Sequence, residues 1–584
     1  MSTAAPVLPQ ERGAPLRRPY RFALAALTLA PIAGGFAFVA AYGVNAPFVD
    51  MWNFIADLVH ERSGHYSWTE IFKQHNEHRL VFPRLVLFAL AGPFRLDDVP
   101  YMYVTEIALL LAAAVILWGV SRTFPSRVAV LLLGPPVAFL AFSYRQRGNM
   151  LLGFNMGFSF VEAFGVLALV LLYVAHESRP RRSAAVAVAA LLPALIASGS
   201  GIQGLLVWPA GIVLLLLLRP VSRGRLEVWT AFGAAVWVAY FWHYRQPLNT
   251  RSPFYPLHHP VEGLRFFATL VGGSLAWSSG QALVIGAVLL GAGVVALVSA
   301  CRIRPSGAQL WVAVLVDAVL VCASIASGRS FAGTDTALSS RYSTYSLLYV
   351  SALLVLVARL VWGRRTRIGL AAVAALVGLI AWGAQDSYRL GMSTAASTAF
   401  GRRLGAFYVA TYRTEPDALL AGVYPDPRVI RTFAPALERL HYSVFDGRGP
   451  LPPLLDHLAR DPGPSACTVD DVRGMRPGPH RLVTLPAGTT SIGSSGWCID
   501  PVAHSTAGGV YFVIDGRAYP AFYGVSRTDV AALLRRGAYV HTGYTSWVVT
   551  GRLAPGLHTF SVIAVSHDRR RAFAPTKPVR IEIS

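Results

Sequence analysis

Long apolar runs, separated by short polar loops, fill the first two thirds of the chain. A helix needs about 20 mainly apolar residues to cross a bilayer, and many of these runs approach that length. Eleven spans are predicted, at residues 22–42, 101–120, 128–143, 151–175, 184–198, 204–218, 228–242, 282–300, 309–326, 343–361 and 368–385. The pattern therefore predicts an α-helical polytopic membrane protein.

Two further apolar runs are short and interrupted. The run from Phe82 to Leu96 contains Pro83 and Pro93, and the run at 264–277 contains two neighbouring glycines. We predict an interfacial helix on the outer surface for the first and an outer re-entrant or interfacial segment for the second.

The placement of arginine predicts the orientation of the spans. The N-terminal segment 1–21 is arginine-rich, and arginine also clusters in short loops at 121–127, 176–183, 219–225, 301–306 and 362–367. Short basic loops favour the cytoplasmic side, and all six segments share that side only if 82–96 does not cross. We predict an uncleaved cytoplasmic tail at 1–21 and an extracytoplasmic C-terminus.

Composition supports this class. The chain is 54% hydrophobic and only 14% charged, outside the range of typical soluble proteins. A net charge of +22 would suit a nucleic-acid partner, but the arginines lie between apolar runs. We therefore read the charge as a topology signal and expect no nucleic-acid partner.

After Gln385 the composition becomes that of an exported globular region. Residues 386–483 are predicted as a linker with α-helical content. Residues 484–584 read as short alternating strands with turn signals, including Asp515-Gly516, and predict a β-sandwich or jelly-roll. Cys467 and Cys498 are the two cysteines of this region, and an exported location makes a disulfide between them plausible.

Polar side chains gather in the first outer loop, residues 43–100. Asp50 follows the first predicted span by eight residues, and His75, Glu77, His78 and Arg79 precede the next apolar run. Polar groups so close to membrane ends are costly unless they are used or solvated. The alternative is an ordinary solvated loop with a charged helix cap.

Other outer loops add cations. Arg145, Arg329 and Arg341, the last beside Tyr342, are candidates for binding a phosphate, since the guanidinium group suits that geometry. For each arginine the alternative is an interfacial anchor.

The architecture resembles the GT-C class of membrane glycosyltransferases. The resemblance rests on the early loop acid Asp50, the long first outer loop, the number of spans, the exported β-region, and QHNEHRLVFPRL (74–85), which is similar to a string in bacterial members. It departs from the class at Met51, where many relatives carry a second acid.

The resemblance implies a catalytic region at 22–385, in a bacterial inner (plasma) membrane. It implies a polyprenyl-phosphate sugar donor and an extracytoplasmic glycan or lipid acceptor, with inversion at the anomeric carbon. Asp50 is the expected general base and Glu77 the second catalytic candidate. His75, His78 and Arg79 are expected to bind substrate.

Three alternatives stay open. His75 and His78 with Glu77 could hold a divalent metal, Mg²⁺ or Ca²⁺, although this set is small for a metal site. The protein could instead be a non-enzymatic polysaccharide exporter or a lipid-linked glycan flippase, which should need a polar path to the cytoplasmic face. Aromatic residues of the β-region could bind carbohydrate or form its core: Tyr511, Tyr519, Tyr523, Tyr544 and Trp547.

Overall fold

The computed structural model describes residues 17–247, 254–362, 364, 366–461, 465–478 and 480–584. Most of the predicted tail at 1–21 lies outside these residues. The chain divides into two compact units. The first comprises Met1–Gly43, Tyr66–Phe94 and Asp98–Thr398, and the second Val44–His65, Arg95–Asp97 and Ala399–Ser584.

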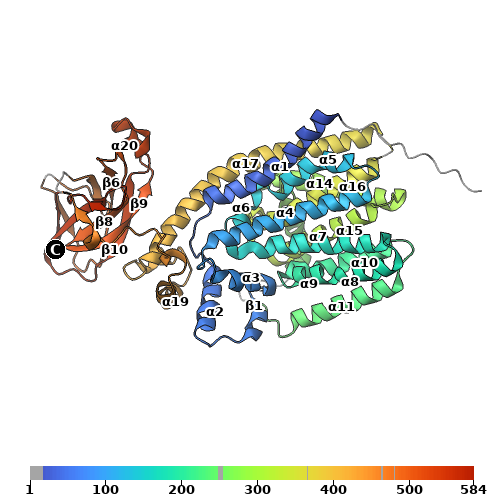
Figure 1. Ribbon diagram of the computed structural model, residues 1–584, viewed down its shortest axis with the longest axis horizontal. Helices are drawn as coiled ribbons and strands as arrows, with labels where there is room; N and C mark the ends of the chain where they lie inside the picture. The colour runs from blue at the N-terminus through green and yellow to red at the C-terminus, as the bar shows by residue number, and fades with distance from the viewer. Residues whose placement is uncertain (1–16, 248–253, 363, 365, 462–464, 479) are drawn as a thin grey trace, which may run out of the picture. The chain divides into compact units, whose positions relative to one another are not determined.

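The first unit is a bundle of long helices that run side by side (Figure 1). Within the described residues, eight helical segments are long and apolar enough to cross a membrane. They correspond to α1 (Arg18–Tyr42), α4 (Asp98–Thr123), α5 (Val128–Ala141) with the short helices after it, α7 (Met156–Glu177), α14 (Ser279–Ile303), α15 (Ala308–Arg329), α16 (Ser343–Val361) and α17 (Arg367–Ala410).

Exposure varies among these helices as expected for a membrane bundle. Nearly all of α16 is buried, whereas Val284, Val288 and Val295 of α14 are more than 60% exposed. Apolar surface of this extent is unfavourable in water and suits contact with lipid chains. The first unit therefore has the character of a multi-pass membrane protein.

Three of the eleven predicted spans are not among the helical segments that are long and apolar enough to cross a membrane. The run 184–198 is divided between α8 (Pro180–Ala189) and α9 (Leu191–Ser198), because Pro193 cannot donate to the carbonyl of Ala189. The run 204–218 gives only the eleven-residue α10 (Val207–Leu217). The run 228–242 lies in α11 (Arg223–Phe241), whose first turns carry charged residues.

The two interrupted apolar runs also form short helices. Residues 82–96 give α3 (Val81–Ala91), and residues 264–277 give most of α13 (Pro260–Gly272). Glycine brings α13 against α14, because a Cβ at Gly272 would lie 1.9 Å from the Ala282 carbonyl oxygen, and one at Gly286 would lie 1.7 Å from that of Ala268. This is the close helix contact that small residues permit in membrane proteins.

The second unit contains a β-sheet region. Its strands are β3 (Ala459–Arg460), β4 (Cys467–Val472), β5 (Leu482–Leu485), β6 (Ser491–Asp500), β7 (Ser505–Thr506), β8 (Gly509–Ile514), β9 (Arg517–Val525), β10 (Gly543–Val549), β11 (Gly556–Val565), β12 (Arg571–Ala572) and β13 (Val579–Ile583). The order is β3-β12-β11-β8-β9-β10-β6-β4, with β13 joining β11 to β5. The sheet thus begins upstream of the predicted boundary at 484.

Turn chemistry and a disulfide fix parts of this sheet. Asp515 and Gly516 both have positive φ (48° and 80°) between the paired residues Ile514 and Arg517, so the predicted two-residue hairpin is confirmed. Cys467 of β4 and Cys498 of β6 are joined by a disulfide with an S–S distance of 2.11 Å.

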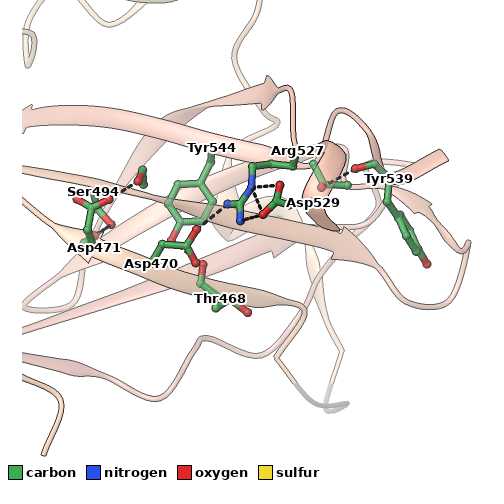
Figure 2. A network of polar contacts seen from close by, with 10 residues as sticks. Thr468, Asp470, Asp471, Ser494, Arg527, Asp529, Tyr539 and Tyr544 are labelled. Carbon is green, nitrogen blue, oxygen red and sulfur yellow. Dashed lines mark hydrogen bonds and ion pairs between the residues drawn. The ribbon is translucent and has the colours of Figure 1, made fainter. Parts of the chain in front are cut away.

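A polar network lies on the same sheet (Figure 2). Arg527 donates to Asp470 at 2.6 Å and to both carboxylate oxygens of Asp529, and the Tyr544 hydroxyl donates to the Thr468 carbonyl at 3.0 Å. These contacts tie the start of α20 (Thr528–Leu533) to β4. The network is internally satisfied, so we assign it a structural role.

Candidate functional site

The string QHNEHR forms a tight hairpin in the first unit. Strands β1 (Gln74–His75) and β2 (His78–Arg79) pair through His75 and His78, with Asn76 and Glu77 as the turn. Asn76 has φ 49°, a conformation that asparagine tolerates well. The sequence thereby presents Glu77 at the tip of the hairpin.

Glu77 meets residues from two distant helices. Its Oε1 forms an ion pair with Arg329, the last residue of α15. Arg329 also donates through Nε to the hydroxyl of Tyr342, the N-cap residue of α16, at 3.3 Å. Both charged side chains are only about a fifth exposed, so the pair is partly shielded from water.

The protonation of this cluster follows from burial and charge. Burial acts to raise the pKa of Glu77, but the charges of His78 and Arg329 outweigh it and hold that pKa below its ordinary value. Burial lowers the pKa of His78 to about 4. His78 is therefore neutral at pH 7, where its Nδ1 accepts from the backbone N–H of Ile202, while Glu77 is ionised and paired with Arg329.

A second cationic group surrounds Trp277. The guanidinium carbons of Arg145 and Arg147 lie 4.4 and 4.9 Å from the centre of the Trp277 ring. Arg145 is only 2% exposed and donates to the carbonyls of Gly273 (2.7 Å) and Leu338 (3.4 Å). Two guanidinium groups thus share one indole ring.

This group has no carboxylate partner among the described residues. The ion pairs formed along the described part of the chain pass from Arg122 to His259, and neither Arg145 nor Arg147 takes part in one. Arg147 Nη1 and Trp277 Nε1 are buried without a hydrogen-bond partner among the described residues. The site thus has two neighbouring positive charges and two buried N–H donors without an acceptor. These features favour an anionic ligand.

One short segment connects the two groups. The carbonyl of Leu338 accepts from Arg145, the carbonyl of Arg341 accepts from Asn149 at 2.9 Å, and the next residue, Tyr342, contacts Arg329. The exposed Arg341 lies with its guanidinium 5.1 Å from the Tyr342 ring. The sequence candidates Glu77, His78, Arg145, Arg329, Arg341 and Tyr342 are therefore brought into one region of the first unit.

Arg79 of the hairpin lies among backbone carbonyls. Its guanidinium donates to the carbonyls of Tyr240 (2.6 Å), Phe72 (2.5 Å) and Trp242 (2.5 Å). These contacts fasten the hairpin to the end of α11 and indicate a positioning role. His75 lies beside Phe154, with ring centres 5.2 Å apart.

Asp50 belongs to the second unit, whereas Glu77 and the arginines belong to the first. It is half-buried and directly precedes α2 (Met51–Arg62). Its neighbour Val49 donates from its backbone N–H to the Val423 carbonyl at 3.0 Å, which anchors this turn within the second unit.

Comparisons with known proteins add little. No family model matches the chain, and no curated protein matches it. Among solved structures, the N-terminal part of the bacterial S-layer protein SbsC is similar at 12% identity, with 73% of this chain and 79% of that chain covered and a TM-score of 0.10. A TM-score this low carries no argument about fold or function.

The structure adds two residues that sequence reasoning missed. Arg147 lies two positions after Arg145, and Trp277 ends the interrupted run at 264–277. Both arginines belong to the polar string YRQRGN (144–149) between two apolar runs, so the sequence could have indicated Arg147 together with Arg145. As for metals, among the described residues no cluster of three or more His, Cys, Asp or Glu is arranged to hold an ion.

The aromatic residues of the β-region separate into two groups. Tyr544 and Tyr511 are buried at 1% and 5% exposure, and the Tyr523 hydroxyl donates to the Cys498 carbonyl at 2.8 Å. Tyr511 and Tyr544 therefore belong to the interior, whereas Tyr523, like Tyr519, is partly buried and packs against it. Tyr519 is half-buried and Trp547 is 38% exposed.

Proposed function

We propose that the protein is a membrane glycosyltransferase of the GT-C type, which transfers a sugar from a polyprenyl-phosphate donor to an extracytoplasmic glycan or lipid acceptor with inversion. The observation that carries the proposal is the pairing of Arg145 and Arg147 on Trp277 without a carboxylate partner among the described residues. A departing phosphate needs cations that already stand in place, in surroundings of low dielectric constant.

The location of these cations supports a lipid-borne donor. Arg145 and Arg147 lie near the end of the apolar segment Val128–Met150, and Arg329 lies near the end of Ala308–Ala332. A phosphate at such a position can be bound while its polyprenyl chain stays in the lipid. Guanidinium groups also offer the forked donors that phosphate oxygens accept.

Asp50 is the proposed general base and Glu77 the carboxylate that orients Arg329. A base is effective when its pKa lies near the working pH. Burial acts to raise the pKa of Glu77, but His78 and Arg329 together hold it below its ordinary value, which makes Glu77 a weaker proton acceptor. In this scheme Asp50 takes the proton of the acceptor hydroxyl as that oxygen attacks the anomeric carbon, and the bond from that carbon to the phosphate oxygen breaks.

The topology belongs to the same proposal. The three shorter helical segments, α8 with α9, α10 and α11, complete eleven crossings, with the N-terminus in the cytoplasm and the β-region, as a sandwich or jelly-roll, outside.

Donor binding tests the proposal most directly. Purified full-length protein in nanodiscs would be incubated with a radiolabelled polyprenyl-phosphate monosaccharide, and retained label measured. Arg147→Ala should weaken binding at least about tenfold, because it removes a charge-assisted contact to phosphate. Arg302→Ala, at an exposed arginine of α14, is the matched control and should bind normally.

The outcome also separates the alternatives. Retention that is unchanged in Arg147→Ala would contradict the phosphate site. Donor binding followed by lipid translocation between leaflets, with the sugar still attached, would favour the flippase instead.

A further inference from the structure

Three loops lie together in the second unit, at the end of the β-region that carries α20 (Figure 1). They are residues 501–504 between β6 and β7, residues 531–538 at the end of α20, and residues 566–570 between β11 and β12. We call these three loops the basic tip. Every residue of the basic tip is exposed except the first residue of each loop.

Hydrogen bonds connect the three loops. The carboxylate of Asp500 is only 2% exposed; its Oδ1 accepts from the backbone N–H of Val502 at 2.8 Å, and its Oδ2 from that of His567 at 2.7 Å. Arg536 of the second loop donates through Nη1 to the carbonyl of His504 at 3.4 Å. The three loops therefore form one connected surface.

This surface is positively charged. The basic tip contains four arginines against one acid. Among the described residues, Arg535, Arg536 and Arg569 are exposed and belong to no ion pair. The acid, Asp568, accepts from the hydroxyl of Ser566 at 2.5 Å. The guanidinium groups of the basic tip are therefore available to external anions.

The basic tip also exposes large apolar side chains. Leu533 is 73% exposed, Val502 59% and Leu534 39%. Leu533 and Val502 flank the contact between Arg536 and His504 along the chain. Apolar side chains among arginines are typical of surfaces that lie in the boundary between lipid headgroups and acyl chains, where the apolar groups enter and the cations meet phosphates.

We propose that the basic tip docks on a bilayer surface with anionic headgroups, with Leu533 and Val502 entering the headgroup region and the arginines contacting lipid phosphates. The charge of the basic tip complements such a surface. Its three loops contain no Phe, Tyr or Trp, the residues on which nucleic-acid bases stack, whereas aliphatic side chains suit lipid.

The covalent link to the first unit favours the same partner. The apolar helices of that unit tie the second unit to a membrane, so a lipid surface is present at high effective concentration and weak docking contacts suffice. Docking is a binding function of the second unit and does not rest on sugar transfer by the first.

Quenching by a lipid-borne nitroxide measures docking in the full-length protein. Ala503→Cys, at an exposed position of the first loop, would carry a fluorophore in a Cys301→Ser background. Labelling is then specific, because Cys322 is buried and Cys467 and Cys498 form a disulfide. The protein would be placed in phosphatidylcholine nanodiscs with and without phosphatidylglycerol, both containing a lipid with a nitroxide on its headgroup.

Phosphatidylglycerol should raise the docking constant obtained from the quenching by at least about fivefold, the contribution of one arginine near an anionic surface. Added salt should lower it, because the attraction is screened. Arg535→Asn should lower it about fivefold; asparagine is chosen because Arg535 has φ 52°, which asparagine tolerates. Leu533→Ser should lower it to a similar degree, because an inserted apolar side chain is lost.

Two control variants distinguish the basic tip from general surface charge and apolarity. Arg580→Ala removes an exposed arginine of β13, and Leu557→Ser removes a 60% exposed side chain of β11. Arg580 pairs with Thr559, so both positions lie near the start of β11, at the opposite end from the loop 566–570. Both variants should dock as the unmodified protein does. Circular dichroism would verify that each variant is folded.

Three results would overturn the proposal. The first is equal quenching with and without phosphatidylglycerol, and the second is unchanged docking in both Arg535→Asn and Leu533→Ser. The third is equal quenching of a fluorophore placed at Leu557→Cys, since the lipid would then approach the β-region without preference for the basic tip. Loss of donor binding in Arg147→Ala would leave the quenching unaffected, so the two proposals fail separately.

Discussion

Single residues in the hairpin 74–79 have separate tasks that their types alone do not reveal. The three carbonyls around Arg79 use its donors, so this arginine holds the loop, whereas Arg329 pairs with Glu77. An arginine beside a carboxylate tunes its pKa, and an arginine surrounded by carbonyls fixes a backbone. The same residue type therefore contributes to the site in two ways.

The assignment of the two acids can be decided by isosteric substitution. Asp50→Asn keeps size and hydrogen bonding but removes the proton acceptor, so turnover should fall by about 10² to 10⁴ with donor affinity kept. Glu77→Gln should mainly weaken donor affinity, because Arg329 loses the partner that orients it. Initial rates and donor binding would be measured for both variants. The reverse pattern would make Glu77 the base.

How far sequence predicted the site depends on the separation of its parts. The hairpin residues 74–79 follow one another in the chain, so the sequence alone shows that they lie close together. The contact between Arg145 and Trp277 joins segments 132 positions apart, and hydropathy gives no information on such a pairing. Arg147 could have been included with Arg145, but only the shared indole ring reveals why both matter.

The sequence predicted the bounds of a helix where the helix coincides with an apolar run. It did not predict them where a proline or a polar continuation of the helix sets the end. Pro193 divides the run 184–198, a break that the apolar composition conceals. Helix α17 continues to Ala410, beyond the predicted end at 385, because polar residues replace apolar ones without a helix-breaking proline. A change in composition marks the end of an apolar surface, which need not be the end of a helix.

The β8–β9 hairpin offers a pH-dependent element. The protonated ring of His558 donates to the Ala554 carbonyl (2.8 Å) and to the Asp515 carboxylate (2.6 Å), and these two acceptors raise the pKa of His558 above the ordinary 6.5. Its stabilising contribution should be complete below pH 6.5 and lost as pH rises through the raised value. Asp515 has a pKa below its ordinary 3.8, so its contribution should be lost only as pH falls through that lower value.

Comparison of the unmodified protein with His558→Asn tests this window. The difference in unfolding temperature of the second unit should be largest between pH 3.8 and 6.5 and should shrink at higher pH. Because Asp515 is 44% exposed, the effect should be small, below about 1 kcal/mol. The matched variant Arg580→Ala should show no such pH dependence. A difference that grows with rising pH would contradict the assignment.

At the scale of the whole molecule, the direction of the chain across the membrane decides where every candidate group can act. Six arginine-rich segments share one side when α3 does not cross and the three shorter segments do. Short helices can complete a crossing when a neighbouring break or tilt adds length, and α8 with α9 spans residues 180–198 with one interruption. An odd number of crossings then puts the two termini on opposite sides.

A reporter fusion tests this arrangement. Alkaline phosphatase, which is active only after export, should be active when fused after Ser584, whereas green fluorescent protein, which matures in the cytoplasm, should be dark there. A second pair of fusions in the loop 121–127 should give the opposite pattern, because its arginines favour retention. Fluorescence after Ser584 together with fluorescence at 121–127 would mean an even number of crossings between these points. In that case α3 or one of the shorter segments would be reassigned first, since α3, α10 and the two halves of the α8–α9 pair are the shortest candidates for a crossing.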